Sequence, residues 1–143
     1  MSSNNLQSAF AGKWYYRSFN NDPDPSKSFN ELEFGQGTIQ IDASGPQNEL
    51  SGLIYGPGWK LDLKGSLNYG DPFSLRMQGK GVVGGNEWIY NYAGYMINPW
   101  INGVGQVPAI VGSIVRVIPH PGGDGGLHPA GVVASFYMVK MDE

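Results

Sequence analysis

The sequence predicts an all-β domain built as a single eight-stranded antiparallel up-and-down barrel. Eight stretches alternate apolar and polar residues with period two, which is the period of a strand with one buried face. Turn-forming residues separate nearly all of these stretches, and short connections favour antiparallel neighbours. Closure into a barrel would remove every exposed sheet edge. A two-sheet sandwich remains the alternative, because the number of strands does not distinguish the two.

The clearest alternation runs over residues 59–67, where large apolar side chains occupy odd positions and polar ones even positions. Glycine, proline, asparagine and aspartate gather between the periodic runs and mark the turns. The predicted strands cover residues 12–19, 30–42, 49–55, 59–67, 73–81, 87–96, 109–118 and 131–140.

Three segments need separate treatment. The strand over 30–42 changes its apolar phase, so we expect a bulge or bend at Gly35–Gly37. Residues 1–11 form a short N-terminal segment in which 6–11 can make one helical turn that plugs a barrel end. The proline- and glycine-rich stretch 119–129 is predicted to be a loop.

Length and composition restrict the class of protein. The 143 residues suit one domain spanning 1–143, and a hydrophobic fraction of 41% with 13% aromatic residues separates the chain from disordered sequences. A net charge of −3 offers no basic field for nucleic acid. The chain has no cysteine, which excludes disulfides, thiolate catalysis and cysteine-ligated metals.

The sequence indicates a cytoplasmic protein with no membrane partner. Residues 1–11 lack a basic segment followed by an apolar core, as a secretory signal would have. The longest apolar stretch, 107–118, is too short for a membrane-spanning helix and includes Arg116.

The opening of the first strand, Gly12-Lys13-Trp14-Tyr15, resembles that of the calycins, the group of lipocalins, fatty-acid-binding proteins and avidins, and is most similar to avidins. The resemblance implies an eight-stranded barrel in which Trp14 closes one end under a basic residue from a late strand. Arg116 or Lys140 would fill that role. The chain departs from the group in having no lipocalin disulfide, no C-terminal helix and no biotin-site pattern, so biotin binding is not implied.

Aromatic residues supply the candidates for a ligand site, because tryptophan and tyrosine combine large apolar area with a polar group. We expect a small apolar or aromatic ligand inside the barrel. The alternative is that the rings only fill the core or cover a subunit interface. If the opposite face of strand 87–96 points inward, Asn91 and Tyr95 become the polar contacts instead. The candidate ligand-binding residues are Trp14, Tyr16, Trp59, Trp88, Tyr90, Tyr92 and Arg116.

Arg116 is the most informative charge, because both faces of its strand are otherwise apolar. A charged side chain in such a place needs a paired or hydrogen-bonded group, or a water-filled cavity. Three interpretations compete: a structural cation–π contact with Trp14, an anchor for a ligand carboxylate, or a residue at the barrel end that reaches water.

Strands 109–118 and 131–140 are apolar on both faces, unlike strands 59–67 and 73–81. An apolar outer face implies that another molecule buries it, and symmetric self-association is the simplest way to do so. We therefore expect a homodimer or homotetramer built on the last two strands.

Signals for catalysis and metal binding are weak, and we predict no cofactor and no metal site. His120, Asp124 and His128 have side chains that can ligate a metal ion. The glycines between them predict a flexible loop instead of a preformed site. Glu87 would be an acid or base only if it pointed inward. Two alternatives to a binding protein remain: a cofactor-free isomerase or cyclase similar to allene oxide cyclases, and a structural module with a filled core.

Overall fold

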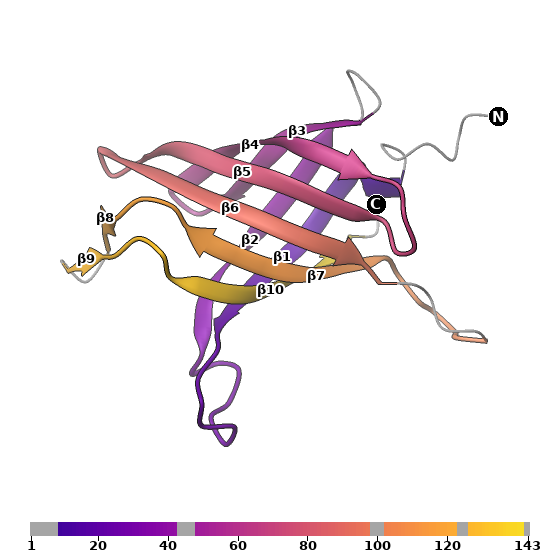
Figure 1. Cartoon of the computed structure of the whole chain (residues 1–143), viewed down its shortest axis with the longest axis horizontal. Helices are drawn as coiled ribbons and strands as arrows, with labels where there is room; N and C mark the ends of the chain where they lie inside the picture. The colour runs from indigo at the N-terminus through magenta and orange to yellow at the C-terminus, as the bar shows by residue number, and fades with distance from the viewer. Residues whose placement is uncertain (1–8, 43–47, 98–101, 123–125, 142–143) are drawn as a thin grey trace.

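The computed structural model describes residues 9–42, 48–97, 102–122 and 126–141. Within them, eight strands close into one antiparallel barrel (Figure 1). Each strand pairs with its neighbours in chain order, and β1 closes the sheet against β10 through pairs from Trp14–Lys140 to Asn20–Ala134. The predicted up-and-down barrel is confirmed. The barrel strands are β1 (Gly12–Asn20), β2 (Glu33–Asp42), β3 (Glu49–Gly56), β4 (Trp59–Asn68), β5 (Ser74–Val83), β6 (Asn86–Met96), β7 (Ala109–Arg116) and β10 (Val133–Lys140).

The inward side chains belong to the apolar phase of each strand. Along β4, Leu61, Leu63 and Leu67 are buried, while the exposed residues between them are Asp62, Lys64 and Ser66. Burial of this alternating set supplies the driving force for closure, at roughly 25 cal/mol for each Å² of apolar surface removed from water. No helix among the described residues has the length and apolarity needed to cross a membrane.

The phase change in β2 is produced by a bulge. Ser18 pairs with Gly35 and Phe19 with Glu33, so Phe34 is passed over in the ladder. The bulge therefore lies one residue before the predicted Gly35–Gly37. Its consequence is that the Phe34 side chain packs against the core on the interior face.

One end of the barrel is closed by Phe10 and Trp14, both of which are fully buried. The Trp14 indole nitrogen donates to the Phe10 carbonyl at 2.9 Å. The Lys140 ammonium lies 5.3 Å from the Trp14 ring centroid, so Lys140 is the late-strand cation at this end and the cation–π interpretation of Arg116 over Trp14 is wrong. Half of the helical turn expected over 6–11, residues 6–8, lies outside the described residues.

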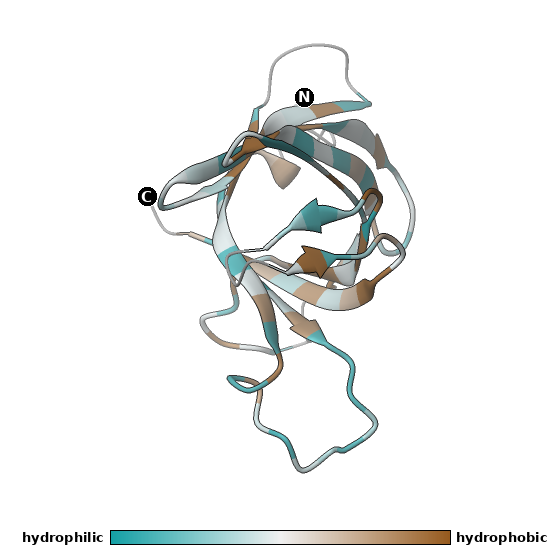
Figure 2. Cartoon of the chain, turned by 90° about the vertical axis from the view of Figure 1, so that its left-hand side faces the viewer, coloured by the Kyte–Doolittle hydropathy of each residue, from teal (hydrophilic) through white to brown (hydrophobic). Residues whose placement is uncertain are grey.

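The opposite end carries a small hairpin of β8 (His120–Pro121) and β9 (Leu127–His128). Figure 2 looks along the barrel and shows these two short strands across its opening. Within the loop predicted over 119–129, residues 120–121 and 127–128 therefore pair as two short strands. The turn chemistry was identified correctly, but the stretch also pairs with itself, and the Gly122 amide donates to the Gly126 carbonyl at 2.8 Å.

Candidate ligand-binding cavity

A cavity of about 270 Å³ lies inside the barrel, towards the end that carries the hairpin. Its volume is close to the lower limit for pockets that enclose drug-sized ligands, about 300 Å³. Side chains therefore do not fill the barrel completely. The lining residues are Tyr16, Ser18, Phe34, Gly35, Gln36, Ile54, Trp59, Leu61, Trp88, Tyr90, Tyr92 and Ile114.

The inner end of the cavity is built from tyrosine rings. Tyr16 from β1 and Tyr92 from β6 meet edge to face with centroids 6.1 Å apart, and both pack against Phe136 from β10. Gly79 on β5 makes room for this arrangement, since a Cβ at that position would lie 3.2 Å from the Tyr92 ring. Edge-to-face packing fixes the orientation of the Tyr16 and Tyr92 rings. Their hydroxyls are the polar groups of this ring cluster.

The mouth of the cavity is narrowed by a second group of rings. Tyr90 meets Phe34 and Trp88 edge to face, with centroids 6.2 Å and 6.4 Å away. His120 of the hairpin stacks on Trp88 at 4.0 Å. Trp88 thus belongs both to the cavity wall and to the contact that holds the hairpin.

Hydrogen bonds join the hairpin to the barrel through Tyr90. The Arg116 Nε donates to the Tyr90 hydroxyl at 2.9 Å, and that hydroxyl lies 2.7 Å from His120 Nε2. His120 Nδ1 lies 3.0 Å from the Pro121 carbonyl. One assignment satisfies all three contacts: Tyr90 donates to Nε2, and Nδ1–H donates to Pro121. In this arrangement His120 is neutral.

The surroundings of His120 favour that neutral form. Burial lowers the pKa of His120, and the charges of Arg116 and His128 lower it further, while the contact with the Pro121 carbonyl opposes the shift. The imidazole is 3% exposed. Protonation would add a cation beside a buried guanidinium and remove the acceptor for the Tyr90 hydroxyl.

Arg116 lies at the mouth and is 6% exposed. Its guanidinium carbon lies 5.0 Å from the Phe34 ring centroid and 5.6 Å from that of Tyr90, and Nη1 donates to the Pro129 carbonyl at 3.2 Å. None of the ion pairs found among the described residues includes it. Two aromatic faces and two oxygen acceptors therefore hold this charge in place of a carboxylate.

Two of the residues that line the cavity carry a hydrogen-bonding atom that is buried away from its open space and has no partner: the Tyr16 hydroxyl and the Trp88 indole nitrogen. The nearby Ser18 hydroxyl donates to the Gly35 carbonyl at 3.3 Å. Burial raises the pKa of Tyr16, although Ser18 opposes the shift, and burial also raises the pKa of Tyr92 well above its ordinary value. Both phenols are neutral, and Tyr16 has a proton to donate.

The cavity brings together five of the seven predicted ligand residues, Tyr16, Trp59, Trp88, Tyr90 and Tyr92. The other two lie elsewhere, Trp14 at the closed end and Arg116 beside Tyr90 at the mouth. The even face of β6 points inward, whereas Asn91 and Tyr95 are exposed outside.

Sequence reasoning missed two important contributors. Phe34 lines the cavity, and the phase change that predicts a bulge also indicates that this side chain turns inward. His120 stacks on the wall residue Trp88, whereas the sequence suggests only a metal-ligand role for it. No local pattern in the sequence indicates that the segment 119–129 folds back to stack His120 on Trp88.

His120, His128 and Glu87, which were candidates for metal binding or acid–base chemistry, do not line the cavity. The rings of His120 and His128 are 5.7 Å apart, and Asp124 lies outside the described residues. Among the residues that the structure describes, no cluster of three metal-ligating side chains occurs. Glu87 is exposed and lies 3.6 Å from Lys80, so it does not point inward.

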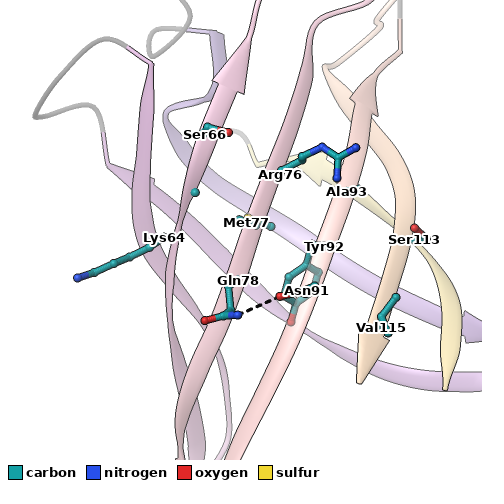
Figure 3. Close-up of a pocket in the computed structure, with 11 residues that line it drawn as sticks. Lys64, Ser66, Arg76, Met77, Gln78, Asn91, Tyr92, Ala93, Ser113 and Val115 are labelled. Carbon is teal, nitrogen blue, oxygen red and sulfur yellow. Dashed lines mark hydrogen bonds between the residues drawn. The ribbon is translucent and has the colours of Figure 1, made fainter. Parts of the chain in front are cut away.

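A second hollow, of about 570 Å³, lies on the outer face of β4 to β7 (Figure 3). The small side chains of Ser66, Ala93 and Ser113 leave this space, and Gln78 donates across it to Asn91 at 3.1 Å. Figure 3 shows Lys64 and Arg76 extending from the same face. The lining of this hollow is more polar than that of the interior cavity.

Comparison with protein-family models finds no match, and comparisons with curated proteins and with solved structures find none either. The relationship to calycins thus rests on the barrel and on Gly12-Lys13-Trp14, and stays a prediction.

Proposed function

We propose that this protein binds a small, largely apolar or aromatic molecule inside its barrel. One observation carries the proposal: an interior cavity of about 270 Å³ is walled by aromatic rings, and its lining carries no charged side chain. Apolar walls with few polar groups are typical of small-molecule sites.

The neutral fluorescent probe N-phenyl-1-naphthylamine tests this proposal on the full chain. We expect its emission to rise on binding and to saturate at one probe per chain. Replacing Ile114 by phenylalanine fills part of the cavity from β7 and should weaken the binding at least tenfold. The matched control is Leu53→Phe on the outer face of β3, away from β7 and β10, which should bind as the parent does. Absence of binding, or equal binding by Ile114→Phe, would contradict the proposal.

We also propose that the protein is a homodimer or homotetramer that associates through the outer faces of β7 and β10. Val111, Val133 and Tyr137 are 41%, 54% and 37% exposed there. The register continues this surface into both neighbouring strands, because Tyr137 pairs with Arg17 of β1 and Val111 with Tyr95 of β6. Covering such an apolar surface is favourable, and a second copy presents the same surface.

Sedimentation equilibrium at micromolar concentration tests the assembly. The parent chain should sediment as a dimer or tetramer, and Tyr137→Lys should shift it towards monomer because a charge would be buried in the contact. The control Thr38→Lys places the same charge on the outer face of β2, away from β7 and β10, and should leave the assembly unchanged. A parent chain that is monomeric under these conditions would overturn this part of the proposal.

A further inference from the structure

We infer that the ligand is a carboxylate: its anionic group pairs with Arg116 at the mouth of the barrel, and its apolar part occupies the cavity. This inference rests on the proposed function and adds the chemical class of the ligand. Three features of Arg116 carry it: its burial, its unpartnered N–H groups and its position along β7.

Arg116 is a buried cation without a counter-ion in the described part of the chain. It is 6% exposed, and the ion pairs found among the described residues join other groups. Its two oxygen acceptors are neutral, because one is the Pro129 carbonyl and burial raises the pKa of the Tyr90 phenol. Neutral acceptors and aromatic faces replace only part of the hydration that a buried charge loses. A negative charge would therefore complete this site.

The guanidinium of Arg116 keeps donors for an incoming anion. Nε donates to Tyr90, and one of the two Nη1 protons is used on Pro129. Nη2 has no hydrogen-bond partner among the described residues. Unlike the Tyr16 hydroxyl, it is not a fully buried unpartnered atom, so a ligand group at the mouth can contact it. Nη1 and Nη2 lie side by side on a guanidinium, and the two oxygens of a carboxylate accept from such a pair.

The position of Arg116 joins this anion site to the cavity. Ile114 lines the cavity, and Arg116 is the next inward-facing residue of β7 towards the mouth. Two residues along a strand span about 7 Å. The Phe34 and Tyr90 rings, which the guanidinium contacts, are also part of the lining. A molecule whose apolar part lies beside Ile114 can therefore place an attached carboxylate at Arg116.

The surroundings of Arg116 match one negative charge better than two. The described residues that line the cavity carry no charged side chain. Burial lowers the pKa of His120, which accepts from Tyr90 in its neutral form. A phosphate dianion would therefore bring a second charge to a partly buried site that lacks a matching cation there, which is costly.

Three naphthalenes test the inference at pH 7.5 by displacing N-phenyl-1-naphthylamine from the full chain. They are 2-naphthoate, 2-acetylnaphthalene and 2-naphthyl phosphate, which supply a carboxylate, a neutral group of similar shape and a dianion. We expect naphthoate to bind roughly tenfold more tightly than the ketone, because a hydrogen bond between two charged groups is stronger than one to a neutral oxygen. The phosphate should bind more weakly than naphthoate.

The variant Arg116→Gln assigns the preference to the guanidinium. Its naphthoate-to-ketone ratio should fall to about one, while N-phenyl-1-naphthylamine binds as it does to the parent. Arg116→Lys keeps a charge but loses the paired donors, so its ratio should lie between those two. The matched control Arg76→Gln removes an exposed arginine from the outer hollow and should keep the full ratio. Circular dichroism checks that the variants keep the fold of the parent.

The variant Ile114→Phe locates the apolar part of the ligand. Because it fills the cavity beside Arg116, it should weaken naphthoate binding as it weakens that of N-phenyl-1-naphthylamine. This measurement and the ratio in the parent chain decide the inference even if the Arg116 variants do not fold.

Several results would overturn the inference while leaving the proposed function intact. They are equal affinity of the parent chain for naphthoate and ketone, a full preference that survives Arg116→Gln, tighter binding of the phosphate, and naphthoate binding that Ile114→Phe does not weaken. If N-phenyl-1-naphthylamine itself does not bind, the proposed function fails.

Discussion

The imidazole of His120 stacks on the indole of Trp88, with centroids 4.0 Å apart and ring planes 12° from parallel. His120 belongs to the hairpin across the barrel opening, and Trp88 belongs to the cavity wall. One ring pair therefore links the cover of the barrel to the space beneath it. A change in the charge of His120 therefore alters its contact with Trp88 in the cavity wall.

Acidification should destabilise the fold through His120. Because its pKa is lowered in the folded chain, the unfolded chain takes up the proton first, near the ordinary value of 6.5. The free energy of unfolding should be highest above that pH, fall as the pH drops below it, and level off under the folded pKa. Urea titrations between pH 7.5 and 5 measure this slope. His120→Phe keeps a ring on Trp88 and should flatten the curve, and an unchanged slope would contradict the assignment.

Removing the cation above Trp14 should loosen the closed end. Lys140→Met keeps the length of the side chain but loses the cation–π contact, which is worth about 1 kcal/mol at a partly buried site. Lys140→Arg preserves a cation and serves as the control. Thermal and urea unfolding should rank the arginine variant with the parent and the methionine variant below both. Equal stability of all three chains would refute this account of the closed end.

Tyr16→Phe should stabilise the protein. The Tyr16 hydroxyl is buried with no partner, so its removal should raise the free energy of unfolding by about 1 kcal/mol. Tyr15→Phe on the exposed face should change stability by less than about 0.5 kcal/mol. A loss of stability on Tyr16→Phe, measured by urea unfolding, would mean that the hydroxyl has a partner in the free protein.

Gly65→Ala should disrupt the contact between β4 and β5. A Cβ at this position would overlap the Arg76 carbonyl oxygen, so the backbones would have to separate. We expect a loss above about 2 kcal/mol in urea unfolding, as overpacking of a tight contact produces. Gly35→Ala is the control, since its Cβ would meet only the Ser18 hydroxyl at 3.5 Å. Similar stability of the two variants would show that the strands are not this close.

Period-two patterning carries much of the fold, because it reports directly which side chains face the core. It located every barrel strand to within about three residues, and it revealed the β2 bulge through the shift from Phe34 to Ile39. It failed for the hairpin of β8 and β9. Strands of two residues are too short to show a periodic pattern in the sequence. The hairpin also depends on contacts with residues that are distant in the chain.

The site is only partly readable from sequence. The odd–even alternation of a strand predicts that Tyr16, Tyr90 and Tyr92 point inward once the inner face is known. It does not predict how far along the barrel axis each ring lies. Trp14 shares the face of Tyr16 and still lies outside the cavity, because it sits one pleat nearer the closed end. The Tyr90–His120 bond joins distant segments and has no local signal.

Intermolecular nuclear Overhauser effects between bound N-phenyl-1-naphthylamine and isotope-labelled protein test the central claim most directly. We predict contacts from the naphthalene protons to the rings of Tyr16, Tyr92 and Trp88 inside the barrel. Contacts to Ser66, Ala93 and Ser113 in the outer hollow, with none to those rings, would contradict an interior binding site.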